Sequence, residues 1–139
     1  MIILDTDVLS ALMDNVPDER VTRWLDRQPT ESIWITSVTE FEVRLGIAKL
    51  PAGRRRSDLH SRYEKLLGEY LENRLLDFDS ASAREAAALA AARERRGRPI
   101  DMRDAFIAGI AVARRATLAT RNVRHFDDLS VPVVDPWHA

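Results

Sequence analysis

Apolar and polar positions follow two different rhythms along the chain, which predict a succession of short strands and helices. Short apolar runs bounded by turn residues are typical of buried strands, and apolar residues recurring every three or four positions are typical of helices. The apolar runs predict strands at 2–4, 32–36, 75–78, 117–120 and 131–134. The helical patterns predict helices at 8–13, 17–28, 37–50, 59–71, 82–97 and 101–115.

Strands that alternate with helices in this way predict an α/β fold, with a mainly parallel central sheet of four to five strands between layers of helices. Pro132 places the last strand at an edge, because proline cannot donate a ladder hydrogen bond. The length of 139 residues predicts a single domain, 1–139. Two S-x-x-E sequences, beginning at Ser37 and Ser82, predict capping boxes, and Asp101 is the expected cap of the helix that follows it.

Composition then narrows the class of protein. The chain is 45% hydrophobic and 31% charged and has no cysteine, which predicts a globular protein without disulfides or thiolate metal sites. No secretory signal or membrane-spanning run precedes the first acids, so we expect a cytoplasmic protein.

Charge is unevenly distributed although the net charge is only −1. Residues 93–124 contain nine arginines against three acids, and Arg54, Arg55 and Arg56 form a second cluster. Either cluster fits a solvated helix face as well as a surface that contacts phosphates, and the sequence leaves both interpretations open.

Position within the predicted elements separates four polar side chains from the many surface acids. Asp5 ends the first strand, Asp104 lies in the first turn of the 101–115 helix, and Asn122 follows the strand at 117–120. Ligands of parallel α/β proteins sit at the carboxyl ends of the strands. Taken singly, Asp5 or Asp7 could also cap a helix, Asp104 could reach back toward Asp101, and Asn122 could be a turn residue.

Glu42 is the fourth candidate, on the helix after the second strand. Its neighbours one turn away are apolar or glycine, which predicts an unusually apolar setting for a glutamate: Val38, Leu45 and Gly46. Glu40, by contrast, is expected to serve the capping box and to pair with Arg44.

A cluster of carboxylates and hydroxyls with few histidines suits Mg²⁺ or Mn²⁺, which prefer oxygen ligands. His60, His125 and His138 show no metal-ligand spacing, and the chain has no glycine-rich phosphate loop. Such ions bind phosphates and activate water, so the pattern predicts phosphodiester chemistry.

The ordered set of motifs resembles PIN domains, and in particular the VapC and FitB group of toxins from type II bacterial toxin-antitoxin pairs. The segments that carry the resemblance span the whole chain: LDTDVLS, TEFEVRLG, DMRDAFIAGIA, LATRNVRHF and DPWH. The resemblance implies a three-layer α/β/α PIN-like fold. It also implies that Asp5, Glu42 and Asp104 are the catalytic, metal-holding acids, with Thr6 and Thr120 as polar neighbours.

One position departs from the family pattern. Many relatives carry a fourth aspartate where this chain has Asn122, which reduces the charge available to a second ion. We therefore expect one firmly bound metal, with a second recruited only alongside RNA phosphate. Asp7 and Asp101 are supporting candidates.

The resemblance further implies a Mg²⁺-dependent endoribonuclease, with Mn²⁺ as a substitute, that cleaves structured RNA such as tRNA or rRNA. The expected partners are a VapB- or FitA-like antitoxin and a second copy of the chain. They would form a toxin-antitoxin hetero-oligomer that meets DNA only through the antitoxin. Arg103, Arg121 and Arg124 are candidate RNA contacts.

Two rival interpretations remain. Asp5 and Asp7 after an apolar strand also resemble the acid pair of haloacid-dehalogenase phosphatases, but Lys65 is the last lysine, and that family needs one late in the chain. The other rival is a PIN-fold binding protein with weak catalysis, which Asn122 permits.

Overall fold

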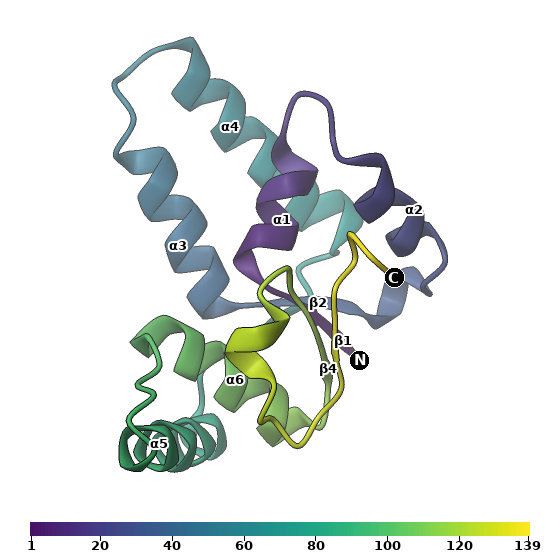
Figure 1. The fold of residues 1–139 in the computed structure, drawn as a ribbon. Helices are drawn as coiled ribbons and strands as arrows, with labels where there is room; N and C mark the ends of the chain where they lie inside the picture. The colour runs from purple at the N-terminus through teal and green to yellow at the C-terminus, as the bar shows by residue number, and fades with distance from the viewer.

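The computed structural model describes residues 1–139 and contains one sheet of five parallel strands with helices on both faces (Figure 1). The strand order is β3-β2-β1-β4-β5, so the first strand of the chain lies at the centre of the sheet. The strands are β1 (Ile2–Leu4), β2 (Ile33–Thr36), β3 (Leu75–Leu76), β4 (Thr117–Ala119) and β5 (Val133–Val134). This confirms the predicted fold class, and β5 lies at an edge as Pro132 predicted.

Six α-helices and three shorter helical segments connect the strands. The α-helices are α1 (Thr6–Met13), α2 (Glu19–Asp26), α3 (Ser37–Ala48), α4 (Arg54–Lys65), α5 (Ser80–Arg95) and α6 (Met102–Arg114). The 3₁₀ segments are η1 (Thr30–Ser32) and η3 (Val123–Phe126), and η2 (Leu66–Tyr70) is a π-helix that prolongs α4. None of the helices is long and apolar enough to cross a bilayer.

Two hydrophobic cores lie on opposite faces of the sheet. Because successive side chains of a strand point to opposite faces, β1 contributes to both of them. Leu4 packs into the core beneath α1 to α4, and Ile3 packs into the core beneath α6. Both side chains are fully buried, which explains the continuous apolar run at the start of the sequence.

Helices α5 and α6 form the layer on the second face and approach each other closely at Gly109. A Cβ atom built on Gly109 would lie 2.4 Å from the carbonyl oxygen of Ser82 and 2.8 Å from the Cβ of Ala86. Gly109 is therefore a packing residue, because only a residue without a side chain permits this contact.

The two predicted capping boxes are wrong in their details. The cap of α3 is Thr36, whose Oγ1 accepts a hydrogen bond from the Thr39 N–H (3.1 Å), and the cap of α5 is Asp79, which accepts from the Ser82 N–H (2.9 Å). A hydroxyl or carboxylate at the position before the first helical turn satisfies the free N–H groups better than a serine already inside the turn. The cap of α6 is Asp101, as predicted.

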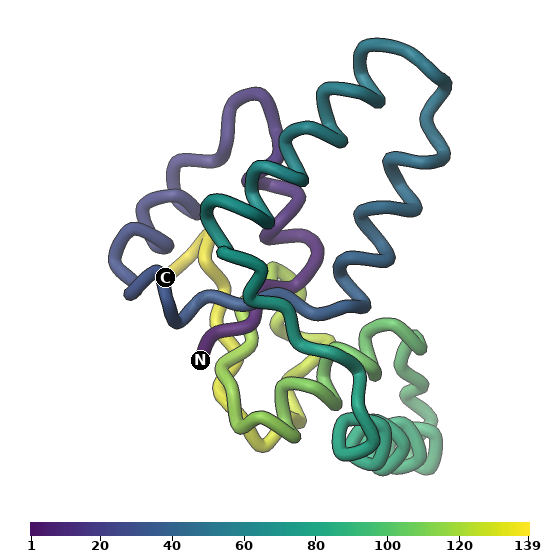
Figure 2. Tube along the Cα trace, turned by 180° about the vertical axis from the view of Figure 1, so that it is seen from behind, coloured from purple at the N-terminus to yellow at the C-terminus, as the bar shows by residue number.

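Helices α3 and α4 form a hairpin that projects beyond the rest of the molecule, as Figures 1 and 2 show from opposite sides. Arg44 joins the two helices: its guanidinium lies 2.9 Å from Glu64 on α4 and 3.3 Å from Glu40 on α3, and it stacks over the ring of Tyr63. The pairing of Glu40 with Arg44 was predicted, and the contact with Glu64 closes the hairpin.

Candidate active site

Asp5 lies immediately beyond β1, where the chain turns into α1. Its Oδ1 accepts the N–H of Thr6 (2.8 Å), which makes it the cap of α1, and its Oδ2 accepts the hydroxyl of Thr120 (2.8 Å). Thr120 follows β4, the neighbouring strand, so two strand ends together fix this carboxylate. The capping alternative and the site position therefore both hold for Asp5, which is only 6% exposed.

Glu42 lies against the first turn of α1. The Thr6 hydroxyl donates to Glu42 Oε1 (2.8 Å), and the hydroxyl of Thr39 lies 3.1 Å from that of Thr6. Arg103 approaches Glu42 Oε2 at 3.6 Å. The apolar setting predicted for Glu42 is thus wrong: its neighbours along α3 are apolar, but the side chain reaches hydroxyls and a guanidinium from other elements.

Asp104 approaches the site from α6. It is half-buried, and its Oδ2 lies 3.6 Å from Nδ1 of His125 in η3. It does not bond back to Asp101, which instead accepts the N–H of Arg103 as the helix cap (3.0 Å). Asp101 is exposed and has a structural role.

Asp104 lies near enough to both Asp5 and Glu42 for their negative charges to interact. Burial, together with the negative charges of Asp7 and, less strongly, Asp104, raises the pKa of Asp5 to about 7, against the lowering effect of hydrogen bonds from Thr120 and Thr6. Burial also raises the pKa of Asp104, with additional contributions from Asp101 and Glu42. A buried carboxylate with this preference for a proton is one that a cation would stabilise in its charged form.

Asp7 is tied to the loop after β4. Its Oδ2 accepts the N–H of Arg121 (3.1 Å), whereas its Oδ1 is buried without any hydrogen-bond partner. Burial raises the pKa of Asp7. An unsatisfied buried carboxylate oxygen is costly unless a cation or water meets it, so Asp7 supports a cation site beside Asp5.

Asn122 begins the turn after Thr120. Its N–H donates to the Thr120 hydroxyl (3.1 Å) and its carbonyl accepts the N–H of His125, so its backbone orders the segment that presents both residues. Its side chain is exposed. The turn role left open by the sequence is confirmed.

The arginine-rich segment divides into paired and free side chains. Arg93 is buried and lies 2.5 Å from Asp128, Arg96 lies 2.6 Å from the same carboxylate, and Arg98 lies 3.0 Å from Asp127. The hydrogen bond from Arg93 lowers the pKa of Asp128 to about 2. These arginines therefore hold α5 against the segment after η3 instead of forming a free basic surface.

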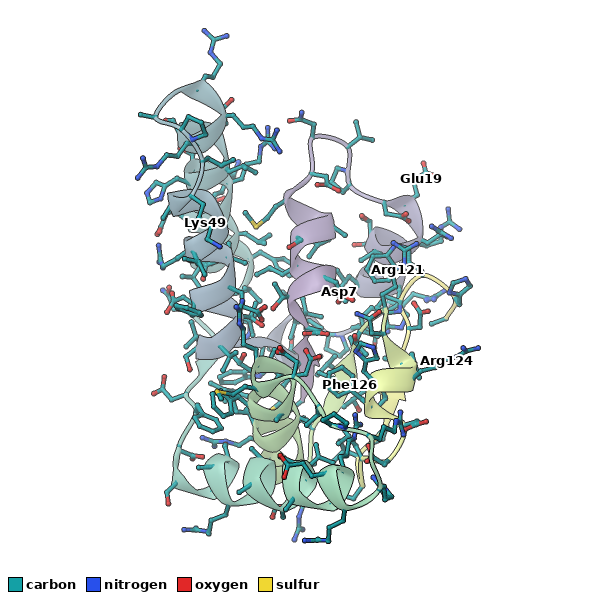
Figure 3. The ribbon with its side chains drawn as sticks, turned by 60° about the vertical axis from the view of Figure 1, so that its left-hand side comes forward. Asp7, Glu19, Lys49, Arg121, Arg124 and Phe126 are labelled. Carbon is teal, nitrogen blue, oxygen red and sulfur yellow. The ribbon has the colours of Figure 1, made fainter.

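The three candidate RNA contacts have different surroundings. Arg103 sits at Glu42 and 5.9 Å from the ring centre of the exposed Phe41. Arg121 stacks over Trp137 at 4.8 Å. Arg124 is exposed and points outward from η3, away from Asp7 (Figure 3). Only Arg103 therefore reaches the acids with its guanidinium.

The donor set fits a hard divalent cation, because the side chains that converge are carboxylates and threonine hydroxyls. The arrangement is nevertheless not a preformed cage: no group of three acidic or histidine side chains stands in a geometry that would hold one ion. The Arg103 guanidinium lies beside Glu42 and the His125 imidazole beside Asp104, and these two acids would exchange such contacts for a metal.

Two polar residues of the site were not predicted from the sequence. The histidines lack metal-ligand spacing, so no sequence pattern indicated His125, although it lies beside Asp104. Thr39 extends the hydroxyl pair at Glu42, and its position three residues before Glu42 places both on one face of α3, a spacing visible in the sequence.

Comparison with known proteins identifies the family. The PIN-domain model matches residues 2–131, so the chain belongs to the PIN-domain family.

Among individual relatives, the plasmid stability protein StbB of Pseudomonas syringae pv. tomato is 37% identical over 139 residues, the whole of both chains. The VapC ribonuclease Y4jK of Sinorhizobium fredii is 36% identical over 99% of this chain and 98% of its own. The crystal structure of FitAcB from Neisseria gonorrhoeae superposes with a TM-score of 0.90 at 35% identity, covering all of both chains. FitAB bound to an IR36 DNA fragment gives the same score and identity, covering 97% of that chain. The resemblance to VapC and FitB proteins is thus confirmed.

Proposed function

We propose that this protein is the toxin of a type II toxin-antitoxin pair and acts as a divalent-metal-dependent endoribonuclease. The observation that carries the proposal is that three acids approach one another at the carboxyl edge of a PIN-type sheet: Asp5 and Glu42 both accept hydrogen bonds from Thr6, and Asp104 lies close enough to raise the pKa of Asp5. The relationship to a VapC ribonuclease gives the reaction class, hydrolysis of RNA phosphodiester bonds.

Asp5, Glu42 and Asp104 would hold Mg²⁺, with Mn²⁺ as a substitute. The ion would neutralise charge on the phosphate and lower the pKa of a bound water. We expect one firmly held ion, because Asn122 supplies no carboxylate for a second.

The protein itself fixes the orientation of these carboxylates through hydrogen bonds. Thr120 and the backbone of Thr6 each occupy one oxygen of Asp5, and the hydroxyl of Thr6 orients Glu42. Arg103, half exposed at the rim beside Glu42, is placed to contact a phosphate of the bound RNA.

The expected assembly follows the relatives. The FitAB and FitAcB structures are complexes, and one of them holds DNA. We propose that this chain likewise pairs with a FitA- or VapB-like antitoxin, forms a homodimer within the complex, and meets DNA only through that partner. The RNA substrate would be structured, such as tRNA or rRNA.

The direct test uses the purified chain freed of its antitoxin. We expect cleavage of RNA when Mg²⁺ or Mn²⁺ is added, loss of cleavage with chelator, and an inactive Asp5→Asn variant. Asp26→Asn, an exposed acid on α2, is the matched control and should cleave like the wild type.

Three results would contradict the proposal. Cleavage that survives chelation or the Asp5→Asn substitution would remove the metal mechanism. Hydrolysis of phosphomonoesters without RNA cleavage would favour the phosphatase, although Asp7 is held by the Arg121 N–H and is poorly placed as a free acid. RNA binding without cleavage would favour the weakly catalytic binding protein.

A further inference from the structure

The end of the α3–α4 hairpin carries a group of exposed basic side chains. We call Lys49, Arg54, Arg55 and Arg56 the hairpin tip; Lys49, labelled in Figure 3, is the C-cap residue directly after α3, and the three arginines form the first turn of α4. All four are exposed, and none lies within 4 Å of a carboxylate. None of the four side chains therefore forms an ion pair.

This distinguishes the tip from the second arginine cluster. Arg93, Arg96 and Arg98 were equally prominent in the sequence, but Asp127 and Asp128 pair with all three. Three arginines of that cluster are therefore neutralised by neighbouring carboxylates, whereas none of the four basic side chains of the tip forms an ion pair.

The charge of the whole protein is divided between the hairpin and the remainder. The hairpin, residues 37–65, contains seven lysines and arginines and four acids, a net charge of +3. The chain as a whole carries −1, so the remaining residues carry −4. A local excess of this size is the electrostatic footprint of a surface that binds a polyanion.

The tip is also unfavourable for α4 itself. Acidic side chains normally occupy the first turn of a helix, where they offset its positive end, but α4 has none there, and its N-cap Gly53 offers no side-chain cap. Three arginines at a positive helix end repel that end and one another. A loss of helix stability of this kind is expected where the charges bind another molecule.

The hairpin holds the tip in a fixed place relative to the acids. Arg44 connects α3 to Glu64 of α4, and Arg62 connects α4 to the Met13 carbonyl at the end of α1 (3.0 Å). Glu42 lies on α3 and Lys49 directly follows that helix, which rises only about 18 Å over its length. One RNA could therefore contact the acids and the tip together.

Basic side chains of the tip border two hollows beside α4, of about 460 and 590 Å³. The first is lined by Arg56 together with apolar side chains such as Ile47, and the second by Arg54 and Arg62 together with Asp14 and Asp58. The large exposed apolar side chains all lie elsewhere: Met1, Val16, Phe41 and Met102. Protein interfaces need an apolar centre, whereas contacts to a sugar-phosphate backbone need mainly charge and donors.

We propose that the hairpin tip binds the sugar-phosphate backbone of a structured RNA at a position remote from the cleaved bond, and so favours folded RNA over short single strands. The inference rests on the proposed function for the identity of the ligand. The tip residues contact no reacting group in this arrangement and are binding residues only.

The experiment compares two triple variants with equal loss of charge. Arg54→Gln, Arg55→Gln and Arg56→Gln together remove the tip, and Arg84→Gln, Arg95→Gln and Arg115→Gln together remove the same charge from the α5–α6 layer. Binding of bulk tRNA is measured as a function of salt in the Asp5→Asn background, which prevents cleavage. Cleavage of tRNA and of a short single-stranded RNA is measured in the otherwise unchanged protein.

For the tip variant we expect the plot of log K for tRNA binding against log[salt] to be less steep, its slope smaller in magnitude by about 2 to 3. Near 0.1 M salt, the affinity for tRNA should be about ten-fold lower or more. KM for tRNA should rise while kcat, and cleavage of the short RNA, stay unchanged. The α5–α6 variant should match the wild type. Arg→Lys at all three tip positions should retain the slope, because it retains the charge.

An unchanged slope and affinity in the tip variant would overturn the inference. A tip variant that binds RNA normally but changes its oligomeric state in sedimentation would also overturn the inference. That result would assign the tip to contact with a second copy of the chain. Tip-dependent RNA binding by a wild-type protein that cleaves nothing would instead contradict the proposed function while leaving this inference in place.

Discussion

Asp5 occupies a position where stability and charge oppose each other. The side chain is buried, its two oxygens are held by Thr6 and Thr120, and burial raises its pKa to about 7. In the unfolded chain the same group has a pKa near 4. Near neutral pH, folding therefore has to bury a carboxylate that prefers to be protonated.

The free energy of unfolding should therefore depend on pH through Asp5 and increase as the pH falls. Between about pH 4 and 7 the native state binds the Asp5 proton and the unfolded state does not, so this group stabilises the protein as pH falls through 7. Asp5→Asn should unfold at higher urea than the wild type at pH 8, by up to about 4 kcal/mol, and the difference should vanish toward pH 4. Urea titrations of both proteins at several pH values measure it. A difference that does not vary with pH would show that Asp5 ionises normally.

At the scale of elements, α5 and α6 approach each other so closely at Gly109 that no side chain fits between them. Gly109 has backbone and side-chain atoms within 3 Å of where its Cβ would lie, whereas Gly46 in α3 has none within 4 Å. The two helical glycines therefore offer a matched pair of substitutions.

Gly109→Ala should destabilise the protein by about 1 to 3 kcal/mol, because α5 and α6 would have to move apart. Gly46→Ala should stabilise it by about 0.5 to 1 kcal/mol, because alanine restricts the unfolded chain and no neighbour clashes. Thermal unfolding of both variants against the wild type measures the two effects. Equal shifts would contradict the close approach at Gly109.

At this scale, the features that could be predicted are those that depend on residues close together in the sequence. The order of strands and helices, the edge position of β5 and the Asp101 cap all follow from nearby residues. The helix caps at Thr36 and Asp79 were missed because an S-x-x-E pattern lay close by in each case, and the π-helical turn in η2 leaves no distinct apolar rhythm. Contacts such as Arg93 with Asp128, 35 residues apart, depend on the folded chain.

The candidate acids illustrate the same limit. Asp5 and Asp104 could be selected from their places at element ends, but the surroundings of Glu42 could not. Its partners Thr6 and Arg103 come from α1 and α6, and only the tertiary fold brings them to α3.

At the scale of the whole molecule, a bound metal should stabilise the fold by mass action. We expect Mn²⁺ to raise the unfolding midpoint of the wild type, by a free energy of about 1.4 kcal/mol at ten times its dissociation constant. Glu42→Gln should lose most of this gain and Asp26→Asn should keep it. Calorimetric scans with and without Mn²⁺ report the effect independently of cleavage. A gain that survives Glu42→Gln would place the ion elsewhere.

The division of charge between the projecting hairpin and the remaining chain makes the protein an electric dipole. A polyanion approaching at low salt exerts a torque on such a molecule and turns the hairpin toward itself before any contact forms. Orientation during diffusion then shortens the search for a productive encounter. The rate of association with RNA, as distinct from the lifetime of the complex, should therefore fall steeply as added salt screens the dipole.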